Sequence, residues 1–140
     1  MRKIILMSLL AFLGFARAAD FSEGQVWSYK TRAGEEASTF LINKIEFHPK
    51  LGSIYHVSVS GVKIKNPRTP TGITSELPHF PVSKETLNKS ITKLAGKSKI
   101  NPEYQQGYQE WKSAFDKGDA GIFTIPVAEI VGVVEKAINQ

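Results

Sequence analysis

The chain has 140 residues, no cysteine and a formal net charge of +5. Without cysteine it can form no disulfide, thiol nucleophile, or cysteine-ligated zinc or iron–sulfur site. Its length suits one domain with a hydrophobic core of its own.

The first 18 residues have the pattern of a secretory signal peptide. Arg2 and Lys3 precede an apolar run, Ile4 to Phe15, and a small-x-small cleavage pattern follows at Ala16-Arg17-Ala18. The alternative is an N-terminal membrane anchor, but the run is shorter than the roughly 20 residues that a helical span needs. We therefore expect residues 1–18 to be a signal peptide cleaved near Ala18, and residues 19–140 to be a single domain.

Export changes the charge balance. Cleavage removes three basic residues and leaves 15 basic and 13 acidic side chains, a net charge of +2. The remainder has no block of five basic residues, which argues against a nucleic-acid partner. An exported protein without cysteine is typical of a bacterial periplasm or medium. No cysteine stands at the cleavage site, so we expect no lipid anchor and no membrane anchor once the signal is removed.

Residues 25–65 predict three antiparallel strands. The segments 25–30, 37–47 and 54–65 are rich in β-branched and aromatic residues, and turn residues separate them. The first half of segment 37–47 is apolar on both sides, which predicts a central strand. The charged turn with Arg32, Glu35 and Glu36 is predicted to be solvated.

The third segment changes its apolar face part-way along. Tyr55 and Val57 share one parity, whereas Val62 and Ile64 share the other. Gly61 stands at the change and can adopt the backbone conformation of a bulge. We therefore predict a bend that curls the sheet.

Residues 66–81 contain four prolines and one glycine. Each proline removes a backbone donor and disfavours helix before it. The composition predicts an irregular loop, with Ile73-Thr74 as a brief edge strand at most. Long loops in compact domains are often functional.

The C-terminal half predicts three helices. Ser83 is a candidate N-cap, and Leu87, Ile91 and Leu94 follow at helical spacing up to Gly96. Further helices are predicted over residues 101–117 and 126–138, with a short strand at 121–125. Strands followed by helices indicate an α+β class. We expect a curved, mostly antiparallel sheet built on an N-terminal three-strand meander, with three C-terminal helices packed on one face.

No established catalytic or cofactor motif is present, and the spacing of the three histidines matches no metal motif. We therefore assign no catalytic residue, cofactor or metal ligand. One pair is notable: if the hairpin turns around Leu51, Glu46 faces His56, and a carboxylate beside an imidazole can support acid–base chemistry. An ordinary cross-strand polar pair is the interpretation we favour. A one-residue slip would separate the two side chains.

The proline-rich segment supplies the candidate binding residues Arg68, Glu76, His79 and Phe80. Two prolines would hold an apolar, aromatic surface in place, and preorganised loops bind at a lower ordering cost. The alternative, which we favour, is a crossover loop that covers the core and buries Phe80.

An aromatic stripe at helical spacing follows in the second predicted helix. Its members are Tyr104, Tyr108, Trp111 and Phe115. Sugar sites use such rings, but at this spacing core packing is the favoured interpretation.

Two blocks, residues 21–39 and 121–131, resemble a family of small, exported, uncharacterised bacterial proteins, and the similarity extends over the mature chain. That family has no established activity, so the resemblance implies bacterial export and assigns no role to any residue.

Together these observations predict a non-enzymatic binding or interaction module of the cell envelope, comparable to inhibitor or immunity proteins. Its partner would be another envelope protein or a small ligand. One alternative is an envelope hydrolase that uses His56 with Glu46, or His79 with Glu76. Another is an accessory subunit of an envelope complex.

Overall fold

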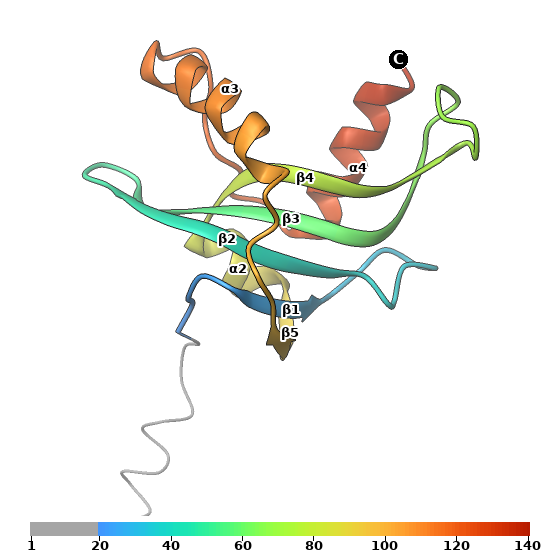
Figure 1. Ribbon diagram of the computed structural model, residues 1–140, viewed down its shortest axis with the longest axis horizontal. Coiled ribbons are helices and arrows are strands. Elements are labelled where there is room, and N and C mark those ends of the chain that lie inside the picture. The colour runs from blue at the N-terminus through green and yellow to red at the C-terminus, as the bar shows by residue number, and fades with distance from the viewer. Residues whose placement is uncertain (1–19) are drawn as a thin grey trace, which may run out of the picture.

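The computed structural model describes residues 20–140, and the predicted signal peptide lies outside the described residues. These residues form one open antiparallel sheet of five strands in the order β4-β3-β2-β1-β5, accompanied by helices (Figure 1). The elements are β1 (Gln25–Tyr29), β2 (Thr39–His48), β3 (Gly52–Lys65), β4 (Ile73–Ser83), α2 (Lys84–Ser90), β5 (Ile91–Lys97), α3 (Tyr104–Asp116) and α4 (Val127–Ile138). The predicted α+β class is confirmed. Within the described part of the chain, no helix is long and apolar enough to cross a membrane.

The predicted meander is present as β1, β2 and β3. Val26 pairs with Leu41, and Phe40 pairs with Val59. The strand β2 is the third of the five, so it is central as predicted.

The bend in β3 lies where the parity change predicted it. Gly61 has a φ of +81°, and the β3–β4 register shifts between Ser60 and Ile64. As a result Val62 and Ile64 join the same buried cluster as Val57. A Cβ atom at position 61 would also stand 3.0 Å from the Cα atom of Ser38. The bulge therefore requires glycine for two reasons, the positive φ and the lack of space for a side chain.

Most of the predicted proline-rich loop is strand β4, and the loop prediction was wrong there. The strand β4 is the outermost strand beside β3. The carbonyl of Pro81 accepts from the backbone N–H of Phe123, on the side away from β3. The donor that Pro81 lacks therefore belongs to the outer side, and no ladder bond to β3 is lost. The predicted strand at 121–125 adds only a single parallel bridge, between Phe123 and Val82.

The first predicted helix ends early. Ser83 caps α2 as predicted by accepting from Thr86, but the helix stops at Ser90, where Ile91 has extended geometry. Residues 91–97 form β5 and pair with β1. Ile91 and Leu94 fit a helical stripe, yet the open edge of β1 offers them a ladder of backbone hydrogen bonds, so tertiary pairing overrides the helical spacing.

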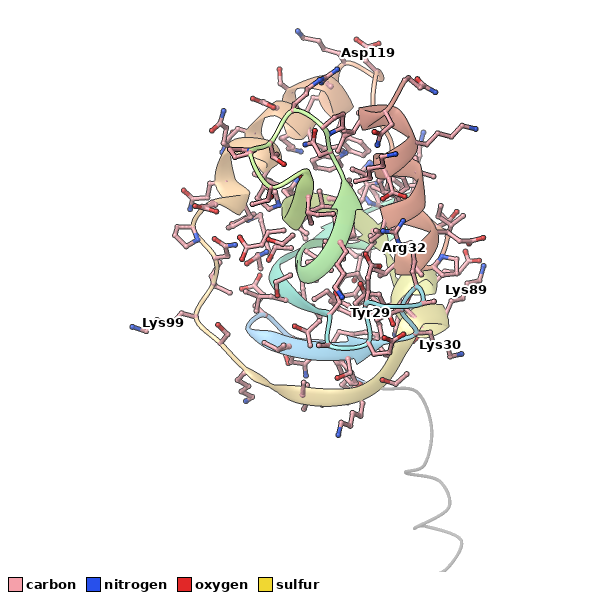
Figure 2. The ribbon with its side chains drawn as sticks, turned by 90° about the vertical axis from the view of Figure 1, so that its right-hand side faces the viewer. Tyr29, Lys30, Arg32, Lys89, Lys99 and Asp119 are labelled. Carbon is pink, nitrogen blue, oxygen red and sulfur yellow. The ribbon has the colours of Figure 1, made fainter. Side chains whose placement is uncertain are left out.

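The helices divide between the two faces of the sheet, which corrects the prediction that all three share one face. Seen edge-on, α3 lies on one side of β3 and β4, whereas α2 and α4 lie on the other (Figure 2). The reason is strand alternation: Val57 packs with Leu87 of α2, and its neighbour His56 contacts Tyr108 of α3.

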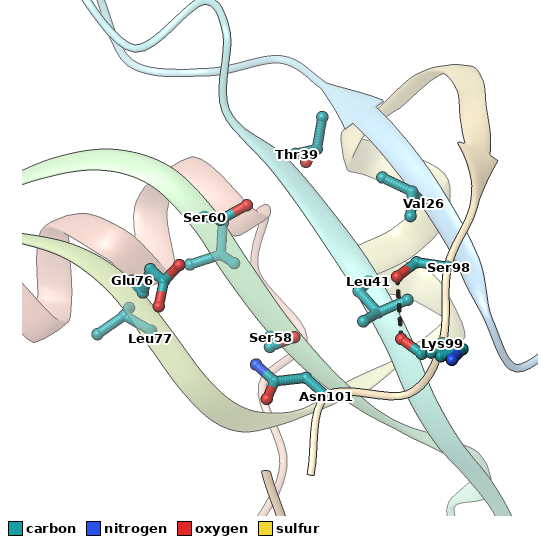
Figure 3. Close-up of a pocket in the computed structure, with 11 residues that line it drawn as sticks. Val26, Thr39, Leu41, Ser58, Ser60, Glu76, Leu77, Ser98, Lys99 and Asn101 are labelled. Carbon is teal, nitrogen blue, oxygen red and sulfur yellow. Dashed lines mark hydrogen bonds between the residues drawn. The ribbon is translucent and has the colours of Figure 1, made fainter. Parts of the chain in front are cut away.

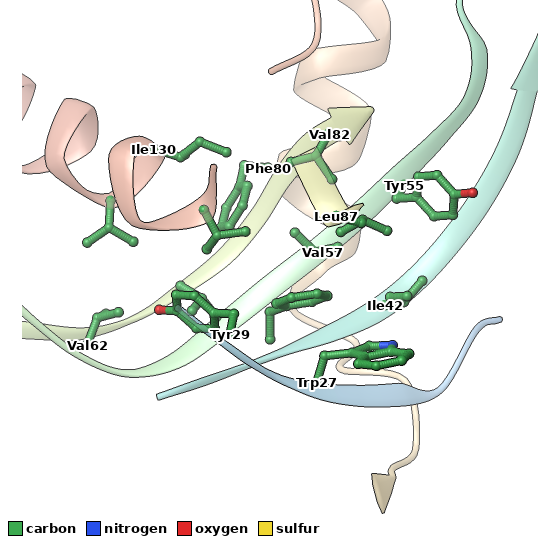
Figure 4. Packing of buried hydrophobic residues seen from close by; sticks show 14 of the residues in the cluster. Trp27, Tyr29, Ile42, Tyr55, Val57, Val62, Phe80, Val82, Leu87 and Ile130 are labelled. Atoms are coloured by element: carbon green, nitrogen blue, oxygen red, sulfur yellow. The ribbon is translucent and has the colours of Figure 1, made fainter. Parts of the chain in front are cut away.

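The face toward α2 and α4 carries the hydrophobic core, which we call the apolar face (Figure 4). Phe40, Ile42, Leu87 and Ile130 are each exposed by 1% or less. The strands supply the floor of this core and the two helices supply its roof. The opposite side, toward α3, is called the polar face below.

The charged turn after β1 is structural rather than merely solvated. Arg32 donates to Glu35 at 2.9 and 2.8 Å and to Glu135 of α4 at 2.9 Å. Glu35 is only 3% exposed and accepts from the backbone N–H of Lys63 at 2.6 Å. These bonds to Arg32 lower the pKa of Glu35 and of Glu135. The network ties the turn and α4 to the bent end of β3.

Candidate functional site on the polar face

A chain of three ionisable side chains lies beneath α3. Nε2 of His56 is 2.6 Å from Oε1 of Glu46, and Nδ1 of His56 is 2.9 Å from Nε2 of His79. His56 pairs with Lys44 in the β2–β3 register, and Glu46 pairs with Ile54. The predicted register was therefore wrong by two residues. Because side chains alternate with a period of two, that error keeps Glu46 and His56 on one face, where they meet diagonally.

The hydrogen bonds define the proton positions. An ionised carboxylate only accepts, so Nε2–H of His56 donates to Glu46, and in the neutral ring Nδ1 is left as an acceptor. Nε2–H of His79 then donates to that nitrogen. Tyr108 donates its hydroxyl proton to the other oxygen of Glu46 at 3.2 Å. The chain therefore runs from His79 through His56 to Glu46, with each donor satisfied.

Burial shifts the pKa values of this chain. His56 is fully buried, and desolvation lowers its pKa even though the adjacent Glu46 opposes the shift. Desolvation and the neighbouring His56 lower the pKa of His79 to about 4. Burial and the charge of Glu46 raise the pKa of Tyr108 to about 12. At neutral pH both imidazoles are therefore neutral, and the site keeps the hydrogen bond from His79 to His56 and those from His56 and Tyr108 to Glu46.

The aromatic stripe of α3 covers the histidines. Tyr108 meets the ring of His56 edge-on at 4.7 Å between centroids, and Trp111 does so at 4.9 Å. A Cβ atom at Gly107 would stand 2.9 Å from Cβ of His79, so glycine permits the close approach of helix and strand. The aromatic stripe therefore packs against the sheet, as predicted, but in a second, partly polar layer and not in the main hydrophobic core.

A buried amide positions the segment that leads into α3. Asn43, 3% exposed, donates to the Ser58 hydroxyl at 3.1 Å. Its carbonyl oxygen accepts from the backbone N–H of Asn101 at 3.0 Å. The β2–β3 register shifts between Ile42 and Lys44, so the bulge at Asn43 turns this amide toward the polar face.

Beside this tether the polar face is hollowed into a pocket of about 310 Å³, which we call the trough (Figure 3). Its polar side chains come from β2, β3, β4 and the segment after β5. They are Thr39, Ser58, Ser60, Glu76, Ser98, Lys99 and Asn101. Val26 and Leu41 add apolar surface, whereas the side chain of Leu77 on the β4 rim packs against the core on the other face. The trough therefore offers hydroxyl groups and one carboxylate above an apolar floor.

The four loop residues predicted to bind do not form one surface. Arg68 is exposed in the turn between β3 and β4. Glu76 lines the trough, whereas His79 lies under α3. Phe80 is 4% exposed and packs in the core on the apolar face. A strand explains the separation, because its successive side chains point to opposite faces.

The sequence analysis missed the trough residues Ser58 and Ser60. The signal was the alternation Val57-Ser58-Val59-Ser60, which places two hydroxyls on the face opposite two core valines. It missed Asn43 and Asn101 because their meeting depends on a bulge and on the path of the chain after β5.

No family model, curated protein or solved structure matches this chain. Across residues 20–140, no group of three or more histidine, aspartate or glutamate side chains converges to hold a metal ion. The arrangement of the polar face is therefore the basis on which function is inferred.

Proposed function

We propose that the protein is a non-enzymatic binding module of the bacterial cell envelope, and that it holds its ligand in the trough. The observation that carries the proposal is the convergence of hydroxyl, amide and carboxylate groups on one hollow of the sheet. Binding sites typically combine apolar walls with a few polar groups that orient the ligand, and this volume is at the lower end of their range. A small molecule, or one side chain of a partner protein, is of matching size.

The position of the histidines supports binding over hydrolysis. A hydrolase would need an imidazole nitrogen at the wall of a cavity, close to a reacting group. None of Glu46, His56 and His79 is among the described residues that line the trough. Nδ1 of His79 instead faces the close approach of α3 at Gly107. The three residues are better explained as the support on which α3 rests.

Export and family membership belong to the same proposal. The pattern of residues 1–18 supports a cleaved signal peptide, and residues 21–39 and 121–131 support membership of the exported family they resemble. N-terminal sequencing of the protein recovered from the envelope fraction tests the first point. We expect the mature chain to begin at or next to Ala19.

A matched pair of substitutions tests the binding proposal. Ser60→Phe fills the trough at an exposed position, and Ser113→Phe places the same ring on the exposed side of α3. The tagged wild type and both variants are recovered from the envelope of producing cells, and bound molecules are identified by mass spectrometry. We expect the wild type and Ser113→Phe to retain a common bound molecule, and Ser60→Phe to lose it. Equal recovery with Ser60→Phe, in a variant whose thermal unfolding is unchanged, would contradict the proposal.

The same experiment separates the accessory-subunit alternative. A subunit would be recovered in fixed stoichiometry with another protein, and that complex would persist in Ser60→Phe. Loss of a small molecule alone would favour the trough as a ligand site.

A further inference from the structure

The trough has a single charged group directed to its interior. Glu76 lies on its β4 rim, opposite Ser60 in the β3–β4 register. No ion pair of residues 20–140 includes Glu76. Lys99 also borders the trough, but its side chain extends away from the ribbon into solvent (Figure 2). A protein with a net positive charge thus presents an uncompensated carboxylate at this hollow.

The groups around Glu76 suit an ammonium ion. An ammonium group carries three N–H donors and no acceptor, so it needs several oxygen atoms. Beside the carboxylate, the trough supplies the hydroxyls of Ser60, Ser58 and Thr39. A carboxylate or phosphate ligand would instead meet the charge of Glu76 at close range, and like charges repel.

The floor of the trough suits an aliphatic stem. Val26 and Leu41, which pair across β1 and β2, line it with branched apolar side chains. Methylene groups gain free energy when they leave water for such a surface. In Figure 3 Leu41 and Val26 lie across the trough from Glu76, so a ligand that bridges them carries its charge at one end and its apolar part at the other.

We propose that the ligand of the trough is a primary aliphatic amine, free or as a lysine-like side chain, whose ammonium group pairs with Glu76. This inference rests on the proposed function and specifies its ligand class.

A series of probes with one stem and different head groups tests the inference. The ¹⁵N-labelled protein is titrated at pH 7 with n-pentylamine, 1-pentanol and valerate, and the amide signals of Ser58, Ser60 and Leu77 are followed by NMR. We expect saturable shifts with n-pentylamine, weaker ones with 1-pentanol and none with valerate. Glu76→Gln should weaken amine binding about two- to fivefold, the range of a solvent-accessible ion pair. The control Glu129→Gln makes the same charge change on an exposed position of α4 and should leave binding unchanged.

The inference is overturned if 1-pentanol or valerate binds as well as the amine, if Glu76→Gln leaves amine binding unchanged, or if the amine causes no saturable shift. In the first case the trough is still a ligand site, so the proposed function survives with another ligand class. A failure of the proposed function itself appears separately, as retention of the native ligand by Ser60→Phe.

Discussion

The two faces of the sheet are built by alternate residues of the same strands, yet they hold their helices by different means. On the apolar face, Val57 and Phe80 belong to one buried hydrophobic cluster with Leu87 of α2 and Ile130 of α4. On the polar face, His56 and His79 meet α3 through hydrogen bonds and ring contacts. One face stabilises its cover by removing apolar area from water, and the other combines ring contacts with hydrogen bonds that pair its buried polar atoms.

The comparison shows that polar side chains can be buried between a helix and a sheet when each of their buried atoms has a hydrogen-bond partner. In the part of the chain that the structure describes, no buried side-chain nitrogen or oxygen lacks a partner. Such a layer depends on each of its members, because removal of one leaves another unsatisfied. The stability of the apolar face depends instead on how completely side chains fill its volume. Substitutions on the two faces should therefore have different effects on the free energy of unfolding.

The largest effect is expected on the apolar face. Phe80→Ala removes a ring that is 4% exposed and should lower the free energy of unfolding by about 3–5 kcal/mol. Urea denaturation at pH 7 measures this loss. His79→Ala, one residue earlier on the other face, serves as the comparison and should cost less. If Phe80→Ala lowered the free energy of unfolding less than His79→Ala does, the claim that the main hydrophobic core lies on the apolar face would be contradicted.

The polar face should respond to pH where the apolar face does not. Burial lowers the pKa of His56, and it lowers that of His79 to about 4, whereas unfolded imidazoles titrate near 6.5. Between these values the unfolded state binds more protons, so stability is complete above about pH 6.5 and falls as the pH decreases toward about 4. With allowance for the partial exposure of His79, we expect a loss of about 2 kcal/mol across this interval.

The pH effect is measured by urea denaturation at pH 7, 6, 5 and 4.5. At the lowest pH values the unfolded state also begins to protonate Glu35 and Glu135, whose pKa values are lowered in the folded protein, and the wild type and a His79 variant share that contribution. His79→Phe removes one titrating ring and should reduce the slope of stability against pH. An identical slope in the wild type and the variant would show that His79 does not contribute.

One glycine in α4 and one in α3 allow the packing of these two helices against the sheet to be compared. Gly132 in α4 has open space at its Cβ position, so Gly132→Ala should stabilise the protein by about 1 kcal/mol through helix propensity. Gly107 in α3 lies against His79, so Gly107→Ala should forfeit that gain and destabilise by about 1 kcal/mol through overpacking. Thermal unfolding of the two variants gives the sign of each change. A stabilising Gly107→Ala would mean that α3 is not closely packed on the sheet.

The smallest effect is expected where an apolar residue belongs to neither layer. Phe47 is 77% exposed at the end of β2. Phe47→Ser should change the free energy of unfolding by less than about 0.5 kcal/mol. A loss comparable to that of Phe80→Ala in the same urea assay would reveal a contact of Phe47 within the folded protein.

The local sequence pattern predicted those parts of the site that depend only on the alternation of side chains along a strand. Glu46 and His56 were expected on one face, and they meet there although the register differs by two residues. The third member, His79, was placed in a loop, because the prolines near it concealed a strand. Its bond to His56 spans 23 residues of sequence and could not be read from spacing.

The sequence by itself determined the meander, the bulge at Gly61 and the last helix, because strand alternation, a glycine at a parity change and helical spacing are local signals. Tertiary structure decided the state of residues 73–83 and 91–97. The outer edges of β3 and β1 offer backbone hydrogen bonds that outweigh the local preference for loop and helix. It also decided that α3 covers the opposite face from α2 and α4, and that Ser98, Lys99 and Asn101, in the segment leading to α3, border the trough. An aromatic stripe specifies that a helix will be buried, but only the assembled sheet determines on which side.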